Sequence, residues 1–436
     1  EICACLVGSE MCIRDRDTMI EKVKFDGFKY IDGGVCAAQG FKANGIQCGL
    51  AHEGATVGKK KNDLAVIIAD RVCSAAAVYT TNKVKGAPIA VTKKNISDGR
   101  AMGVIVNSVN ANTCNADGPE KARKMCELAA GEFGLKPADF IVASTGVIGQ
   151  PLPIEPIEKG ISELCRGVSY EGNGAAVEAI MTTDTQPKEV AAVFEIGGKK
   201  CVIGGMLKGS GMIHPNMATT LTFITTDVSI APEYLQRALN DVVKDTLNMV
   251  SVDGDQSTND MCCVMADGMA GNSEIKSENE DFEKFENALY VVMMNLARMM
   301  ARDGEGATKL VECICAGADD LNTARIVAKS VITSSLFKAA VFGEDANWGR
   351  ILCAVGYADA EFDIDKVDVD LASNAGKIAV CRNGSGVPFS EEVAKEILSE
   401  EEIKVIVSIG EGEYSAAAWG CDLTYDYVKI NGDYRS

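Results

Sequence analysis

The most informative part of this chain is a glycine-rich loop that ends in two threonines, Lys208-Gly-Ser-Gly-Met-Ile-His-Pro-Asn-Met-Ala-Thr-Thr-Leu221. Glycine and proline favour a tight backbone, and the apolar run at 221–225 is typical of a buried strand. A threonine at the start of such a strand can attack its own preceding carbonyl. Cleavage there would free an α-amine, which then acts as general base for the hydroxyl of the same residue. The spacing alone leaves open an ordinary loop that leads into a strand with β-branched residues.

Composition excludes several classes of protein. The chain has 436 residues, more than one core usually accommodates, so we expect two halves. Its net charge of −19 disfavours nucleic acid and anionic membranes as partners, because like charges repel. No apolar run reaches the roughly 18 residues of a membrane-spanning helix. The 17 cysteines are odd in number and lack a C-x-x-C motif. We therefore expect buried thiols in a reducing cytoplasm and no metal site.

Residues 1–18 do not resemble part of a folded protein. Met11-Cys-Ile-Arg-Asp-Arg16 matches the translation of a sequencing adaptor, and the segment lacks the apolar core of a signal peptide. We expect the natural chain to begin near Met19.

The hydrophobic pattern predicts an α+β protein with layered sheets and helices, because strand runs and helix runs are segregated. Expected helices lie at 119–134, 157–165, 232–250, 277–302 and 322–342. Expected strands lie at 64–69, 75–79, 103–106, 140–144, 221–225, 362–365, 377–380, 403–408 and 423–430, with a hairpin of 190–194 and 201–204 around Gly197-Gly198.

The loop at 208–221 resembles the autoprocessing site of the ornithine acetyltransferase (ArgJ) family, the glutamate N-acetyltransferases of arginine biosynthesis. Further blocks agree in order over nearly all of 25–436. They are Thr80-Thr-Asn-Lys-Val-Lys-Gly-Ala-Pro88, Ser144-Thr-Gly-Val-Ile-Gly149, Met181-Thr-Thr-Asp-Thr185, Asp253-Gly-Asp-Gln-Ser-Thr-Asn-Asp260, Gly304-Glu-Gly-Ala-Thr-Lys309, Gly343-Glu-Asp-Ala-Asn-Trp-Gly-Arg350 and Ile430-Asn-Gly-Asp-Tyr-Arg-Ser436.

The resemblance implies a self-processing fold with an N-terminal threonine nucleophile, related to the DmpA-like aminopeptidases. Cleavage between Ala218 and Thr219 would give an α chain, 19–218, and a β chain, 219–436, that begins with the nucleophile. The two chains would intertwine in a two-domain layered sandwich and assemble as an α2β2 heterotetramer.

The resemblance also implies the site residues. Thr145 and Gly146 would form the oxyanion hole, and we expect the strand that ends there to leave both N–H groups unpaired and directed outward. The family's substrate contacts fall on Thr182, Lys208, Thr219, Glu305, Asn431 and Ser436.

The implied reaction moves the acetyl group of N2-acetyl-L-ornithine to L-glutamate by a ping-pong mechanism through an acetyl-threonine ester. Lys208 and hydroxyls suit the substrate carboxylate, and Glu305 suits the distal ammonium. No metal or prosthetic group is implied. Some family members are bifunctional and also take acetyl-CoA as donor, and the sequence leaves open whether this one does.

Departures from the family pattern leave alternatives. Thr220 stands where methionine is common, so the cleavage register is open between Thr219 and Thr220. Gln256 replaces a threonine, with an expected effect on packing only, and Ser436 replaces a terminal threonine. A self-processing aminopeptidase or amidohydrolase with water as acceptor, and a cysteine-rich thiol or metal buffer, are the other candidate functions.

Four further side chains have simple structural explanations. His214 lies inside the loop, but the family mechanism uses the threonine amine as its base, so we expect His214 not to be catalytic. His52 is expected at the surface. Asp253 and Asp255 lack the closing glutamate of a calcium loop, which favours a turn or a hydrogen-bonded network.

We predict that the chain cleaves itself between Ala218 and Thr219. The intact mass of freshly purified, untagged protein under denaturing conditions should reveal two chains, the second beginning at Thr219. A second chain that begins at Thr220 would move the nucleophile by one residue. A single uncut chain would contradict self-cleavage.

Overall fold

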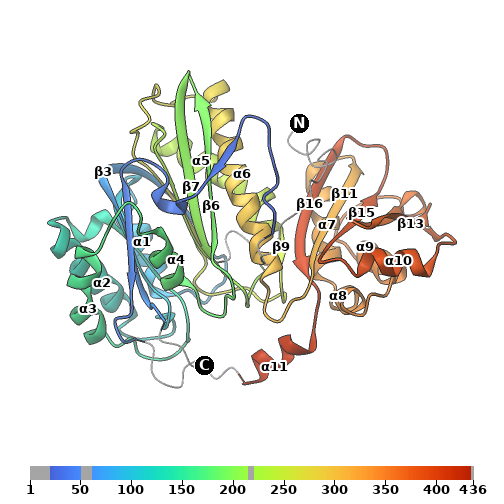
Figure 1. Cartoon of the computed structure of the whole chain (residues 1–436), viewed down its shortest axis with the longest axis horizontal. Coiled ribbons are helices and arrows are strands. Elements are labelled where there is room, and N and C mark those ends of the chain that lie inside the picture. The colour runs from blue at the N-terminus through green and yellow to red at the C-terminus, as the bar shows by residue number, and fades with distance from the viewer. Residues whose placement is uncertain (1–19, 51–60, 215–219, 434–436) are drawn as a thin grey trace.

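Two β-sheets with helices between and around them form the protein (Figure 1). The computed structural model describes residues 20–50, 61–214 and 220–433. The predicted α+β class is therefore confirmed. No helix in the described ranges has the length and apolar character needed to cross a bilayer.

The first sheet combines strands from both sides of the glycine-rich loop. Its order is β1-β6-β7-β8-β10-β3-β4-β5, with β2 beside β3. The central strands β8 and β10 run parallel, so residues 220 and 260, just before them, lie at the same end of the sheet. The strands are β1 (Lys29–Ile31), β2 (Phe41–Ile46), β3 (Leu64–Tyr79), β4 (Arg100–Asn107), β5 (Phe140–Ser144), β6 (Lys188–Ile196), β7 (Lys199–Lys208), β8 (Leu221–Thr226) and β10 (Met261–Ala266).

Helices cover both faces of this sheet, and its strands therefore alternate between two apolar environments. Along β10, Cys262 and Val264 belong to the core shared with α5 and α6. Met261 and Cys263 belong to the core on the opposite face, which includes α4. A third core lies under α2 and α3. The helices are α1 (Ala87–Asn95), α2 (Gly118–Phe133), α3 (Glu155–Arg166), α4 (Asn173–Ile180), α5 (Pro232–Val242) and α6 (Glu280–Arg302).

The second sheet is built from the C-terminal third of the chain, with the short β9 at one edge. Its order is β14-β13-β12-β15-β11-β16-β9. The strands are β9 (Val250–Ser251), β11 (Leu310–Ala318), β12 (Asp368–Ser373), β13 (Gly376–Arg382), β14 (Ser385–Gly386), β15 (Glu402–Ser408) and β16 (Tyr414–Cys421). The accompanying helices are α7 (Leu321–Thr333), α8 (Ser335–Phe342), α9 (Trp348–Gly356), α10 (Glu391–Leu398) and α11 (Tyr425–Asp433).

The long helix α6 lies between the two sheets (Figure 1). It packs on β6 and β7 of the first sheet and on β9, β11 and β16 of the second. Residues 288–301 are all buried, so this part of α6 has no solvent-facing side. A helix that is covered all round is typical of a position inside a large core.

Two of the expected helices are shorter than predicted. The helix expected at 232–250 ends at Val242, where α5 is followed by two 3-10 turns. The Thr246 hydroxyl donates to the Val242 carbonyl at 2.7 Å and so competes with the backbone hydrogen bonds of a continuing helix. The helix expected at 322–342 is two helices, α7 and α8. They part at Ser334, whose hydroxyl accepts from the Phe337 N–H and caps the second helix.

Four of the predicted strands differ in the structure. The runs at 64–69 and 75–79 are one strand, β3, with a bulge between Ile68 and Cys73. The strand expected at 362–365 is wrong, because the Asp363 carboxylate accepts from the Asp365 N–H and forms a turn. The strand expected at 423–430 is also wrong. It is the helix α11, near whose start the Thr424 hydroxyl accepts from the Tyr427 N–H.

Candidate active site

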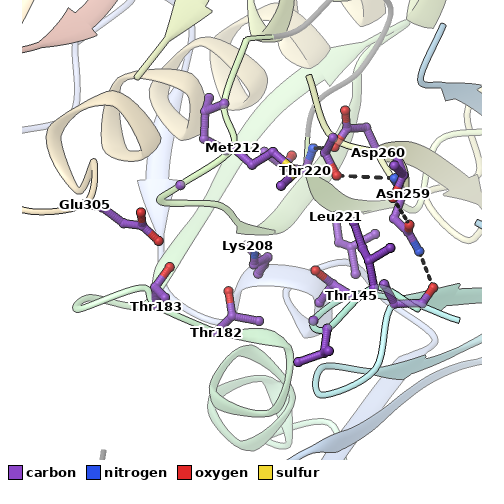
Figure 2. A pocket seen from close by; sticks show the side chains of 18 of the residues that line it. Thr145, Thr182, Thr183, Lys208, Met212, Thr220, Leu221, Asn259, Asp260 and Glu305 are labelled. Carbon is purple, nitrogen blue, oxygen red and sulfur yellow. Dashed lines mark hydrogen bonds between the residues drawn. The ribbon is translucent and has the colours of Figure 1, made fainter. Parts of the chain in front are cut away.

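One pocket of about 370 Å³ brings together most of the predicted site residues (Figure 2). Its walls come from the ends of β5 and β7, the start of β8, the loop before β10, the loop after α6, and α11. Thr145, Gly146, Thr182, Lys208, Glu305 and Asn431 all line it. The other predicted residues, Ala218, Thr219 and Ser436, lie outside the described ranges, as does His52.

The oxyanion-hole prediction needs one correction. The Thr145 N–H is not free, because it donates to the Asn107 carbonyl at 3.0 Å, continuing the pairing of β4 with β5. In the described part of the chain, the Gly146 N–H and the Thr145 hydroxyl have no partner. The donors that remain available to an oxyanion at this position are therefore one hydroxyl and one N–H. Gly146 has a φ of +120°, and a Cβ there would lie 2.1 Å from the Val109 carbonyl oxygen, so only glycine fits.

Lys208 supplies the positive charge of the pocket. It is the last residue of β7, paired in register with Leu221 at the start of β8. Its side chain is half-buried, and no carboxylate in the described ranges forms an ion pair with it. Because the Lys208 ammonium is not engaged in an ion pair with a described residue, it can bind a carboxylate in the pocket.

Glu305 supplies a negative charge, and it is separated from Thr145 by Lys208 and Thr182 in the view of Figure 2. The carboxylate is 9% exposed and accepts from the Asn431 amide at 2.8 Å. Among the described residues no lysine or arginine forms an ion pair with it. A Cβ on Gly211 would lie 2.2 Å from the carboxylate carbon, so the loop needs glycine there to pack against Glu305. Glu305 also lies shortly after the end of α6, so it belongs to the loop that terminates this helix.

The segment before β10 contributes residues that were not predicted as site residues. Asp260 accepts from the Thr220 N–H at 2.8 Å and so fixes the backbone at the start of β8. The Asn259 amide donates to the Ser144 carbonyl at 2.9 Å and holds the end of β5 against this segment. Both belong to the block at 253–260, and its position directly before a strand parallel to β8 is the signal that points to them.

Thr220 has an unusual backbone conformation for a β-branched residue, with a φ of +118°. Its hydroxyl is within 2.8 Å of the Thr222 hydroxyl. The strain lies directly beside the predicted cleavage site, and local strain of this kind is often found at functional positions.

Asp253 and His214 both make hydrogen-bonding contacts that explain them structurally. Asp253 accepts from the N–H groups of Met212 and Ile213 at 2.7 and 2.9 Å, which confirms the predicted turn network. His214 Nδ1 lies 3.1 Å from the Ser251 hydroxyl, and His214 is not among the residues that line the pocket. Burial, assisted by the Lys329 ammonium, lowers the pKa of His214 to about 4.

A hydroxyl, an N–H group, a cation and a carboxylate thus lie around one pocket that Thr220, with its unusual backbone conformation, also lines. Such a set of groups suits acyl transfer on a charged substrate. The comparisons with known proteins specify the family. The ArgJ family model matches residues 42–436, and the chain therefore belongs to the ArgJ family.

Individual relatives are similar over most of their length. The chain is 49% identical over 397 residues to the arginine biosynthesis bifunctional protein ArgJ 1 of Clostridium acetobutylicum, which covers 91% of this chain and 96% of the relative. It is 48% identical over 407 residues to the ArgJ protein of Caldanaerobacter subterraneus, covering 93% and 99%. A crystal structure of ArgJ from Bacillus halodurans matches 49% of this chain and 98% of its own chain, with 44% identity and a TM-score of 0.46.

We predict that His214 makes the protein less stable below pH 6.5 without taking part in catalysis. An unfolded chain protonates histidine near pH 6.5, whereas the folded chain does so near pH 4. Between these values only the unfolded state gains the proton, so the contribution is lost as the pH falls from about 6.5 to 4. His214→Gln should reduce the fall in thermal midpoint between pH 7 and pH 5, measured against the wild type. An equal fall in thermal midpoint in His214→Gln and the wild type would show that His214 does not cause this loss of stability.

Proposed function

We propose that this protein transfers the acetyl group of N2-acetyl-L-ornithine to L-glutamate and releases L-ornithine and N-acetyl-L-glutamate. The observation that carries the proposal is the convergence of Thr145, Gly146, Lys208 and Glu305 in one pocket of an ArgJ-family chain. The relatives named as arginine biosynthesis bifunctional proteins support both the enzyme class and the pathway.

The charges of the pocket support a specific mode of binding. N-acetylornithine carries a carboxylate at one end and an ammonium at the other. In the proposed mode the carboxylate binds Lys208 and the Thr182 hydroxyl, while the ammonium binds Glu305. Asn431 holds the Glu305 carboxylate ready for the ammonium through its hydrogen bond.

The proposed chemistry has two matched halves. The Thr219 hydroxyl attacks the acetyl carbonyl and passes its proton to the α-amine of the same residue. The tetrahedral oxyanion accepts from the Thr145 hydroxyl and the Gly146 N–H, the C–N bond breaks, and ornithine leaves with the proton. The glutamate amine then attacks the acetyl-threonine ester, which forms N-acetylglutamate and restores the free hydroxyl.

The nucleophile would be made by the chain itself. The Thr219 hydroxyl attacks the carbonyl of Ala218, the amide becomes an ester, and water hydrolyses the ester to a new carboxylate and a free threonine amine. The strained Thr220 beside this position, held by Asp260, supports the choice of site. We further propose that the two resulting chains remain intertwined and pair as α2β2, since the first sheet draws strands from both.

A cytoplasmic location fits this function. All fourteen described cysteines carry free thiols, as expected in a reducing compartment. Acetyl-CoA remains a candidate second donor, in keeping with the word bifunctional in the names of the relatives.

The test is an assay that follows both N-acetylglutamate and free acetate after N-acetylornithine and glutamate are supplied. Transfer should yield N-acetylglutamate and ornithine in equal amounts with little acetate. Release of acetate at a rate independent of glutamate would favour the amidohydrolase alternative instead.

We predict that Glu305→Gln abolishes recognition of the distal ammonium in the same assay. The wild type should prefer N-acetylornithine to N-acetylnorvaline, which lacks that ammonium, by about 10- to 100-fold, the range expected for a hydrogen bond to a charged group. Glu305→Gln should bring the ratio of kcat/KM values close to one. Glu413→Gln, which removes an exposed carboxylate outside the pocket, is the control and should keep the wild-type ratio. If Glu305→Gln keeps the wild-type ratio of kcat/KM values, Glu305 does not bind the ammonium.

A further inference from the structure

A buried ion network lies directly behind the pocket. The Lys188 ammonium is 2.7 Å from an Asp184 oxygen and also forms an ion pair with Asp303. The side chains of Lys188, Asp184 and Asp303 are 1%, 0% and 9% exposed. Charged groups are rarely so buried unless they are paired, so the three depend on one another.

The three residues come from separate segments of the chain. Asp184 lies in the loop between α4 and β6, Lys188 is the first residue of β6, and Asp303 directly follows α6. Asp184 and Lys188 precede the proposed cleavage position and Asp303 follows it. The network therefore joins the two parts of the chain that cleavage would separate.

Asp184 and Asp303 each also hold part of the pocket wall. Asp184 accepts from the N–H of Thr182 at 2.9 Å and from the N–H of Gly209, which follows Lys208, at 2.8 Å. The backbone carbonyl of Asp303 accepts from the hydroxyl of the next residue, Ser210, at 2.6 Å. Asp184 thus holds Thr182 directly and Lys208 through the neighbouring Gly209, while Glu305 lies two residues after Asp303.

The charges of the network support one another. Burial alone would raise the pKa of Asp184, but the ammonium groups of Lys188 and Lys208 hold it well below its usual value. Burial alone would lower the pKa of Lys188, but the carboxylates of Asp184 and Asp303 keep it raised. Asp184 and Lys188 therefore both stay charged at neutral pH despite their burial.

We propose that Lys188 is a positioning residue that fixes the distance between the cationic and anionic ends of the pocket. Through Asp184 it holds Thr182 and Lys208, and through Asp303 it holds the loop that carries Glu305. Lys188 itself does not line the pocket. The identity of the substrate in this inference rests on the proposed function, whereas the geometry does not.

The test replaces Lys188 with methionine and compares it with a matched loss of a buried cation. Arg298 on α6 is 7% exposed in its side chain and pairs with Glu402 at 2.8 Å, outside the pocket. Lys188→Met should lower kcat/KM for N-acetylornithine by about 100-fold, the size expected from a misplaced binding group, with most of the change in KM. Arg298→Met should lower the thermal midpoint but leave KM unchanged.

A second readout does not depend on the reaction. Amide hydrogen exchange in peptides that cover 181–186 and 207–211 should be faster in Lys188→Met than in Arg298→Met or the wild type, because Asp184 would no longer hold Thr182 and Gly209. If the wild type shows no acetyl transfer, the exchange experiment alone decides the inference. Equal KM changes in both variants, or unchanged exchange in Lys188→Met, would overturn it.

A milder variant covers the case in which Lys188→Met does not fold. Asp303→Asn keeps the size of the side chain and its capacity to accept a hydrogen bond while removing the charge. It should raise KM in the same direction and speed exchange at 181–186, because the Thr185 N–H donates to the Asp303 carboxylate. Wild-type values for both in Asp303→Asn would equally overturn the inference.

Discussion

The packing of both sheets on α6 is the constraint on which the rest of the structure depends. Residues 288–301 are buried on every side, so the helix cannot shift without disturbing the core that spans both sheets. In its middle, the buried Asn295 donates from its side-chain amide to the Tyr30 hydroxyl, which ties the helix to the N-terminal part of the chain. A helix held in this way delivers its C-terminal loop to a fixed place, and that loop carries Asp303 and Glu305 into the site.

The charged groups around the pocket divide into two kinds. Lys188 is paired with two carboxylates and lies behind the wall, where it serves the structure. Lys208 and Glu305 line the cavity, and neither forms an ion pair with another described residue. Since a buried charge without a partner is unfavourable, charges left without protein counterions in a cavity are suited to a charged ligand. A substrate with one anionic and one cationic end satisfies both.

The sequence predicted the secondary structure well where patterns were long and strongly apolar, as in β5, β8 and α6. It failed where one hydroxyl or carboxylate redirects the backbone. Ser334 divides a continuous helical pattern, and Thr424 starts a helix in a run whose alternation and aromatic content are typical of a strand. Such caps are local hydrogen bonds that periodicity does not detect.

The sequence named several residues that line the pocket, but not Asn259 or Asp260 and not the geometry. The family resemblance identified Thr145, Lys208 and Glu305, whereas the pairing of the Thr145 N–H with Asn107 depends on how β4 meets β5.

The most direct test of the account is to incubate the protein with N-acetylornithine in the absence of glutamate and measure the intact masses. One acetyl group on the chain that begins at Thr219, removed when glutamate is added, is the predicted result. Formation of N-acetylglutamate with no acetylated chain at any time would contradict the ping-pong mechanism.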